Sequence, residues 1–159
     1  MTTKPPAKLS AKPAKAGPAA LRPVDQRLCF LIYSTSLAMT QTYKPLLEET
    51  GLTYPQYLAM VVLWEQDGIA VKDLAARLGQ DSGSMTPLLK RLESAGLVTR
   101  QRTPGDERSL SLLLTPAGQA LREKARKVDA AFERACDLSD DQVGQLLEGM
   151  ETLRGHLQR

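Results

Sequence analysis

Two cysteines, Cys29 and Cys136, are the side chains of this 159-residue sequence with the most evident reactivity. They lie more than a hundred positions apart, so they form neither a CxxC redox pair nor a compact zinc-binding knuckle. With His156 as the single histidine, a histidine-rich metal site is not expected either, and we expect no metal and no cofactor. Two free thiols therefore remain as candidates for reaction with an oxidant.

The form of cysteine that attacks a peroxide is the thiolate, which is the minor form at neutral pH of a free thiol with a pKa of about 8.5. Asp25 is a good N-cap for a helix that contains Cys29 near its start, where the positive end of the helix dipole favours a thiolate. Phe30 and Tyr33 make the approach to this sulfur apolar, which suits an alkyl or lipid hydroperoxide. Two alternatives stay open. The Cys29 thiol could instead be buried in the core as a small hydrophobic group, and Tyr33 could be a packing residue that does not line a pocket.

The composition favours one soluble domain of helices packed through aliphatic side chains. Hydrophobic residues make up 42% of the chain and aromatic residues only 4%. The longest apolar runs are far shorter than the roughly 18 residues of a membrane span, and the first twenty residues contain no apolar signal sequence. We therefore expect a cytoplasmic protein that does not contact a membrane, in which a permanent disulfide is disfavoured.

The net charge of +3 is unevenly distributed along the chain. Four lysines and several prolines lie in the first twenty residues. Without these four lysines, the rest of the chain has 17 basic and 18 acidic side chains. We interpret residues 1–22 as a disordered basic tail, which either attracts DNA weakly or serves only as a solubilising leader. Any nucleic-acid site must therefore arise from local clustering of charge within residues 23–159.

The middle of the sequence has the pattern of a winged helix-turn-helix. Apolar residues at helical spacing predict helices over 71–78 and 82–94, separated by a short turn that contains glycine. Alternation of apolar and polar residues then predicts two strands, 97–102 and 109–114, joined by a turn. A hairpin that directly follows a helix-turn-helix is a wing, so residues 68–117 are the expected DNA-binding unit.

Longer helices are predicted on both sides of this unit. The first runs from Asp25 to about Glu49, and a capping box at 53–56 opens the next one. Thr115 and Pro116 start a long helix that reaches about Ala135, and a second capping box, at 139–142, opens the last helix. The apolar stripes of residues 23–50 and 116–159 exceed what one winged helix covers. We therefore expect a mainly α-helical fold with a small β-hairpin wing, whose terminal helices form a dimerisation domain.

The candidate DNA-binding residues lie on the second helix of the motif and on the wing. Short hydroxyl side chains at the start of that helix suit base edges or phosphates, and basic side chains further along suit the phosphate backbone. Arginines on the wing can bind in a narrow minor groove, and Asp106 lies close enough in sequence to orient the guanidinium of Arg108. The set is Ser82, Ser84, Thr86, Lys90, Arg91, Arg100, Arg102, Asp106 and Arg108. The alternative is an exposed helix with ordinary surface charge.

Several strings of residues resemble the MarR family of bacterial winged-helix repressors. They are LAARLG at 74–79, LLKRLE at 88–93, AGLV at 95–98, DER at 106–108 and LTPAG at 114–118. Four further strings resemble the organic-hydroperoxide-sensing (OhrR-type) branch of that family. They are LCFLIYS at 28–34, YKPLL at 43–47, LTYPQY at 52–57 and DSGSMTPLLKRLE at 81–93.

This resemblance implies a homodimeric repressor that releases double-stranded operator DNA when an organic hydroperoxide oxidises a thiol. The sensor cysteine of the branch matches Cys29, and the tyrosines that hydrogen-bond it across the dimer match Tyr43 and Tyr54. A second cysteine, present in one subgroup, matches Cys136. A sulfenic acid at Cys29 would then be trapped by Cys136 of the other subunit as a disulfide. Phe30 and Tyr33 would line the pocket.

Two other functions compete with this one. The first is a MarR-type repressor released by a small aromatic ligand that binds without a covalent bond, for which Cys29 would be dispensable. The second is a thiol peroxidase that turns over. We expect no enzyme, because no arginine-bearing peroxidase motif lies beside the cysteine and a sensor needs only stoichiometric oxidation.

Overall fold

The computed structural model describes residues 21–103 and 106–159, and the side chains of residues 103 and 106–109 lie outside this description. The expected tail at 1–22 therefore falls almost entirely outside the described residues. By its internal contacts the chain divides into two compact units, residues 1–39 and 40–159. The expected fold class is confirmed, since the elements are helices and one antiparallel hairpin.

The described part of the first unit begins with a short turn rather than with the predicted helix. Val24–Gln26 form a 3-10 turn, η1, and the next residue, Arg27, is extended with φ −97° and ψ 128°. Helix α1 (Leu28–Leu46) starts only after this extended residue. The prediction that Asp25 caps the helix was therefore wrong, because η1 closes its own hydrogen bonds onto Pro23 and Val24 at 3.1 Å.

Helix α1 also ends earlier than expected. Pro45 lies in its last turn, and a proline has no N–H with which to continue the helical ladder. A second 3-10 turn, η2 (Glu48–Thr50), follows and ends at Gly51, whose φ of 68° is left-handed. The polypeptide then reverses into α2, as the glycine at this position allows.

Helix α2 (Tyr54–Glu65) runs through the middle of the hydrophobic core. The predicted capping box is present, since Gln56 Oε1 accepts a hydrogen bond from Thr53 N at 2.8 Å. Seven residues of this helix are buried: Gln56, Tyr57, Ala59, Met60, Val62, Leu63 and Trp64. Because α2 is buried on most sides, it is the element against which α3, α4 and β2 pack.

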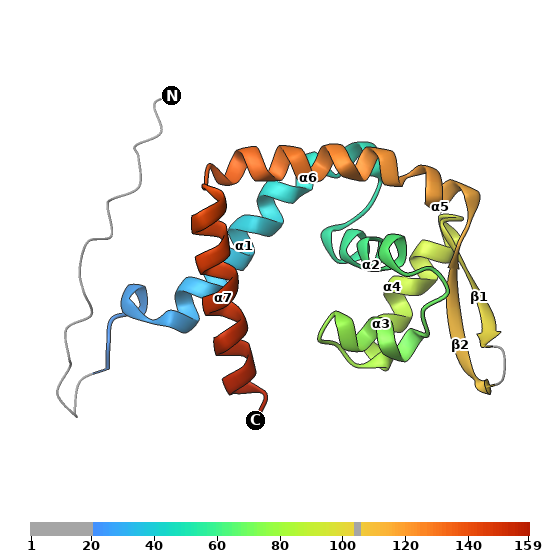
Figure 1. Ribbon diagram of the computed structural model, residues 1–159, viewed down its shortest axis with the longest axis horizontal. Helices are drawn as coiled ribbons and strands as arrows, with labels where there is room; N and C mark the ends of the chain where they lie inside the picture. The colour runs from blue at the N-terminus through green and yellow to red at the C-terminus, as the bar shows by residue number, and fades with distance from the viewer. Residues whose placement is uncertain (1–20, 104–105) are drawn as a thin grey trace. The chain divides into compact units, whose positions relative to one another are not determined.

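The helix-turn-helix is formed by α3 (Val71–Arg77) and α4 (Ser82–Ser94), and the second helix has its predicted bounds. Leu74 and Ala75 of α3 are buried, as are three apolar residues of α4, Met85, Leu89 and Leu92. Helix α4 packs against α2, α3 and strand β1 (Val98–Thr103), so its other face stays open. Figure 1 shows α2, α3 and α4 grouped together beside the hairpin.

The wing pairs β1 with β2 (Asp106–Leu114), antiparallel and with Val98 opposite Leu114. Its base is joined to the loop after α2, where one carboxylate oxygen of Asp67 accepts from Gly68 N at 2.9 Å and from Leu114 N at 2.8 Å. A β-bridge between Ala70 and Ser111 adds a short third pairing that the sequence analysis did not predict. Both contacts attach β2 to the segment between α2 and α3.

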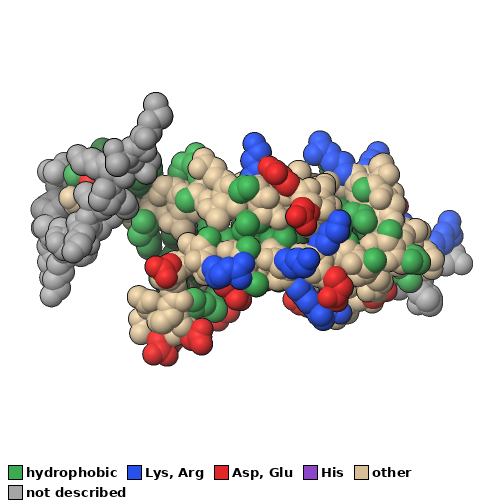
Figure 2. Space-filling view, turned by 90° about the horizontal axis from the view of Figure 1, so that it is seen from above, with side chains coloured by type: hydrophobic (Ala, Val, Ile, Leu, Met, Phe, Trp, Pro, Cys, Tyr) green, Lys and Arg blue, Asp and Glu red, His purple; other side chains and the backbone are tan. Residues whose placement is uncertain are grey.

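The predicted long helix after the wing is interrupted once. Residues Pro116–Ala120 form α5 and Arg122–Cys136 form α6, with a break at Leu121, after which Asp140–Leu157 form α7. Ala125 and Val128 of α6 are buried against the core. Its outer face carries basic and acidic side chains side by side, which Figure 2 shows from above. The part of the chain that the structure describes contains no helix long and apolar enough to cross a membrane.

Large apolar side chains remain exposed on α7 and on the first turns of α1. On α7 they are Val143, Leu146, Leu147, Met150 and Leu157, and on α1 they are Leu28, Phe30, Leu31, Tyr33 and Leu37. Several exposed apolar side chains on one helix are characteristic of an interaction site, and each of the two helices has them.

Helix α5 packs so closely against the residue that follows the helix-turn-helix that Gly118 has no room for a side chain. A Cβ atom added at Gly118 would lie 2.1 Å from the backbone oxygen of Leu97, and the carbonyl of Gly118 accepts a hydrogen bond from Trp64 Nε1 at 2.9 Å. Gly118→Ala should therefore lower the free energy of unfolding by about 1–3 kcal/mol, measured by urea denaturation. As the control, Gly144→Ala meets no atom within 4 Å and should raise stability by up to about 1 kcal/mol. Equal effects of the two substitutions would contradict this account.

Candidate functional site

Cys29 is the second residue of α1, and its side chain is exposed. It lies closer to the start of the helix than the sequence predicted, within the turn whose backbone N–H groups have no helical partners. The alternative of a buried core thiol is not what the described chain shows. The Cys29 sulfur is thus open to a reagent, at the positive end of a helix of 19 residues.

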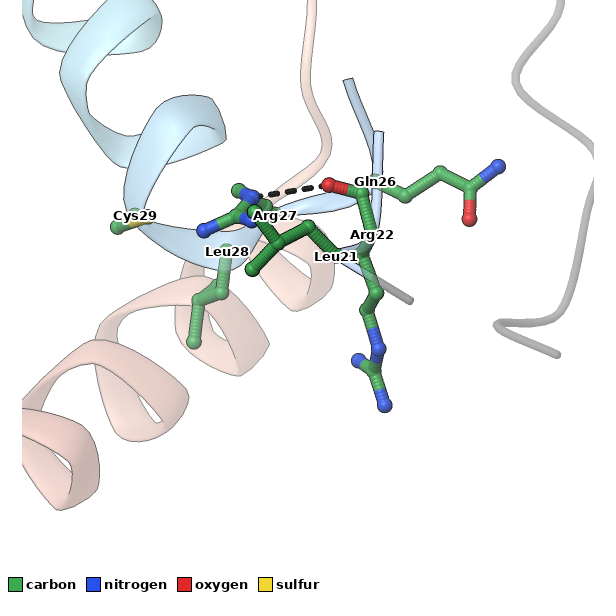
Figure 3. Close-up of a pocket in the computed structure, with 6 residues that line it drawn as sticks. All are labelled: Leu21, Arg22, Gln26, Arg27, Leu28 and Cys29. Atoms are coloured by element: carbon green, nitrogen blue, oxygen red, sulfur yellow. Dashed lines mark hydrogen bonds between the residues drawn. The ribbon is translucent and has the colours of Figure 1, made fainter. Parts of the chain in front are cut away.

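A hollow of about 380 Å³ adjoins this thiol within the first unit. Its lining residues come from η1, its flanks and the start of α1, and are drawn in Figure 3. They are Leu21, Arg22, Gln26, Arg27, Leu28 and Cys29. The guanidinium of Arg27 is fixed there, since its Nε donates to the carbonyl oxygen of Arg22 at 3.0 Å. The two expected pocket residues, Phe30 and Tyr33, do not line this hollow and are exposed beside it on α1.

The second unit contains a stack of three aromatic rings. Tyr43 lies between Tyr54 and Phe132, with ring centroids 4.4 Å and 4.2 Å apart and interplanar angles of 25° and 17°. Tyr57 packs against Tyr43 at a centroid distance of 5.7 Å. The stack joins the end of α1 to the start of α2 and to α6. Aromatic pairs of this kind are each worth about 0.5–1.5 kcal/mol beyond the area that they bury.

The hydroxyl groups of these tyrosines are used differently. Tyr57 donates its O–H to the carboxylate of Asp129 on α6. No acceptor for the hydroxyls of Tyr43 and Tyr54 is found among the described residues. Burial raises the pKa of both groups, and for Tyr43 the neighbouring Tyr54 and the charges of Asp129, Cys136 and Glu133 raise it further. Both phenols therefore remain protonated donors at neutral pH.

Cys136 is the last residue of α6, and its thiol is exposed. It follows Phe132 by one helical turn, which places the two side chains on the same face of the helix. Its influence on the pKa of Tyr43 agrees with that placement. The structure thus brings Cys136 into the neighbourhood of Tyr43, while Cys29 belongs to the other unit.

The first turn of α4 exposes the three hydroxyl residues expected to meet DNA, Ser82, Ser84 and Thr86. Asp81 caps this turn by accepting from Ser84 N at 2.9 Å, and that hydrogen bond lowers the pKa of the Asp81 carboxyl group. The hydroxyl of Ser84 in turn donates to the Asp81 carbonyl oxygen at 2.8 Å. An acidic cap at this end competes with a phosphate, so the basic side chains further along are the better candidates for phosphate contacts.

The basic side chains of the expected DNA surface divide into two groups. Lys90, Arg91 and Arg102 are exposed. Arg100 instead turns toward α4, with its Nε 2.8 Å from Oε2 of Glu93 and both side chains only 22% and 31% exposed. The contact is an ion pair between strand β1 and helix α4.

Two wing residues of the prediction, Asp106 and Arg108, have side chains outside the described residues, although their backbone belongs to β2. They stay predictions.

Four functional neighbours were missed by the sequence analysis: Asp81, Glu93, Asp129 and Phe132. For Asp129, Phe132 and Cys136 a signal existed, because their spacing places them on one face of a helix. The partner of Arg100 had no comparable signal, since a strand and a helix meet only in the folded chain.

Comparison with known proteins gives matches over most of this chain. Residues 52–110 match the model of the MarR family. The organic hydroperoxide resistance transcriptional regulator of Bacillus subtilis is 43% identical over 130 residues, which cover 82% of this chain and 88% of that protein.

Two solved structures of AbfR, a protein of Staphylococcus epidermidis, are also similar. Reduced AbfR bound to DNA matches with a TM-score of 0.70 and 34% identity, covering 84% of this chain and 93% of that one. The disulfide-formed state of AbfR matches with a TM-score of 0.60 and 32% identity, covering 84% and 91%.

The different placements of Arg100 and Arg102 predict different salt dependences of DNA binding. Arg102→Gln should remove a phosphate contact and reduce the slope of log K against log salt by about one for each protomer. Arg100→Gln should weaken DNA binding but leave the slope of log K against log salt unchanged, because the charge of Arg100 is paired with Glu93. Fluorescence anisotropy with labelled duplex at several salt concentrations measures both.

Glu93→Gln is the matched variant for the ion pair. If the pair positions the wing, this variant weakens binding as Arg100→Gln does. Tighter binding by Glu93→Gln would mean that Glu93 only repels DNA, and the positional role of Arg100 would be rejected.

Proposed function

Because this chain belongs to the MarR family, we propose that it is a redox-sensing transcriptional repressor, which binds operator DNA as a homodimer and releases it when an organic hydroperoxide oxidises Cys29. The observation that carries the proposal is the exposed thiol of Cys29 in the first turn of α1, beside an open hollow. A thiol in the cytoplasm, where we place this protein, starts reduced and is available to an oxidant.

The DNA-binding half rests on the geometry of α4 and the wing. Helix α4 is buried on one side and presents Ser82, Thr86, Lys90 and Arg91 on the other. The hairpin is held beside it through Asp67 and the Arg100–Glu93 pair. A helix in the major groove with a wing over the neighbouring backbone is the arrangement that such a unit uses. The similarity to DNA-bound AbfR supports the same use here.

The sensing half is a two-step oxidation of sulfur. The Cys29 thiolate attacks the outer peroxide oxygen, the O–O bond breaks, and the peroxide leaves as an alcohol once its oxygen takes a proton. The resulting sulfenic acid then reacts with the Cys136 thiol of the partner subunit, which forms the S–S bond and releases water. The second step needs the Cα atoms within about 7 Å.

Tyr43 and Tyr54 are the hydrogen-bond donors that we assign to the sensor. Their phenols have no acceptor among the described residues, and their raised pKa values keep the protons in place. A phenol that donates to sulfur stabilises the thiolate relative to the thiol. Placed across a homodimer, these donors would make each sensor depend on the partner subunit.

The exposed apolar residues supply the surface for that homodimer. They lie on α7 and on the first turns of α1, in the segments at the two ends of the chain. Their burial between two copies would place two α4 helices on a pseudo-palindromic operator. The same burial would bring the segment that contains Cys29 into the interface.

Oxidation reaches the DNA-binding unit through the aromatic stack. Tyr43 contacts Tyr54 and Tyr57 of α2, and α2 packs directly against α4. A disulfide at Cys136, on the face of α6 that carries Phe132, would displace the stack and with it α2. We infer that this displacement changes the separation of the two recognition helices.

The hollow between α2 and α6 gives little support to release by a non-covalent aromatic ligand bound there. The hollow between α2 and α6, lined by Trp64, Arg122 and Asp129 among others, has a volume of about 180 Å³. Sites for small molecules commonly have volumes of about 300–1,000 Å³.

Loss of the sensor thiol should separate DNA binding from peroxide response. We expect Cys29→Ser to bind the operator with wild-type affinity and to remain bound after treatment with cumene hydroperoxide, whereas the wild type is released. An electrophoretic mobility shift assay measures both. Release of the Cys29→Ser protein by the same treatment would reject thiol sensing.

The covalent product should be a disulfide between subunits. Non-reducing electrophoresis of the wild type after oxidation should show a band at twice the 17.4 kDa mass of the chain. Cys136→Ser should lack this band and accumulate the sulfenic acid instead, detected by mass after trapping with dimedone. Persistence of the band in Cys136→Ser would exclude this pairing.

A further inference from the structure

The hollow beside Cys29 combines an exposed thiol with a guanidinium whose orientation is fixed by a hydrogen bond. Arg27 uses its Nε to donate to the Arg22 carbonyl oxygen, which leaves the N–H groups of both terminal guanidinium nitrogens for other acceptors. Within the described residues Arg27 has no acidic partner, and Asp25 of η1 does not line the hollow. Figure 3 shows its guanidinium on the side of the hollow that faces Cys29.

The remaining walls of the hollow accept an apolar skeleton. Leu21 and Leu28 supply hydrocarbon, and Gln26 is a neutral polar residue. The volume of about 380 Å³ lies within the range of small-molecule sites. A half-buried arginine whose orientation is fixed by a backbone hydrogen bond is well suited to a carboxylate, which it binds through two parallel N–H···O contacts.

We propose that Arg27 makes this site selective for organic hydroperoxides that carry a carboxylate, whose anionic end it binds while the peroxide group meets Cys29. This inference rests on the proposed function, since it names the oxidant class of the same sensor. The reaction is unchanged: sulfur gains the outer oxygen, and the hydroperoxide is reduced to the corresponding hydroxy acid. Binding of the carboxylate raises the local concentration of peroxide at the thiolate.

The test uses a pair of oxidants that differ only in charge. They are cumene hydroperoxide with a para-carboxylate and the methyl ester of the same compound. The protein is the full chain with Cys136→Ser, in which Cys29 is the remaining thiol. Rapid quenching and thiol titration give the second-order rate constant for oxidation by each compound.

We expect the acid to oxidise Cys29 about five to ten times faster than the ester, as a partly solvated charge-assisted contact allows. Arg27→Gln should bring this ratio to about one by slowing the acid alone, while Arg27→Lys should keep part of it. In 1 M salt the ratio should also fall, because the Debye length shrinks to about 3 Å. Arg126→Gln removes the same charge from an exposed position on α6 and should leave the ratio unchanged.

Equal rates for acid and ester, or a ratio that Arg27→Gln leaves intact, would overturn the selectivity and leave the sensor in place. If neither compound nor plain cumene hydroperoxide oxidises Cys29, the proposed function itself fails, and the selectivity with it. The ester rate in Arg27→Gln reports whether the substitution has damaged the thiol site, and an unchanged value shows that it has not.

Discussion

The stacking of Tyr43 between Tyr54 and Phe132 is the contact on which the second unit depends. It joins the end of α1 and the start of α2, which are close in sequence, to the last turns of α6, which are distant from both. Rings in contact at both faces cannot shift independently, so a movement of one helix is passed to the other two. The hydrogen bond from Tyr57 to Asp129 adds a polar connection between α2 and α6 at the same level.

The DNA-binding unit is held together by polar contacts at its edges as well as by its core. Trp64 reaches α5, Asp67 reaches the end of β2, and Thr115 donates to the Gly96 carbonyl oxygen at 2.6 Å. Each contact joins segments that periodicity alone cannot pair. Together they attach the end of β2 and α5 to α2, to the loop after α2 and to the residue Gly96 that follows α4. A DNA-binding unit needs its parts fixed in this way, since base contacts require a fixed register.

The two thiols lie at the surface, in contrast to the packed contacts described above. Cys29 and Cys136 are exposed at the start of α1 and at the end of α6, outside the packed core. A reactive cysteine must be reached by its oxidant, and a position at the end of a helix leaves it reachable without disturbing the core. Both thiols therefore lie apart from the packed core.

The sequence alone determined the features that depend on neighbours along the chain. The bounds of α4, both capping boxes and the hairpin followed from spacing and from residue type, because caps and periodicity act within one or two helical turns. Tertiary structure decided the rest. Arg100 faces Glu93 instead of solvent, and Tyr43 takes Phe132 as its second stacking partner. These outcomes depend on residues that meet only when distant segments pack, and no local pattern encodes such a meeting.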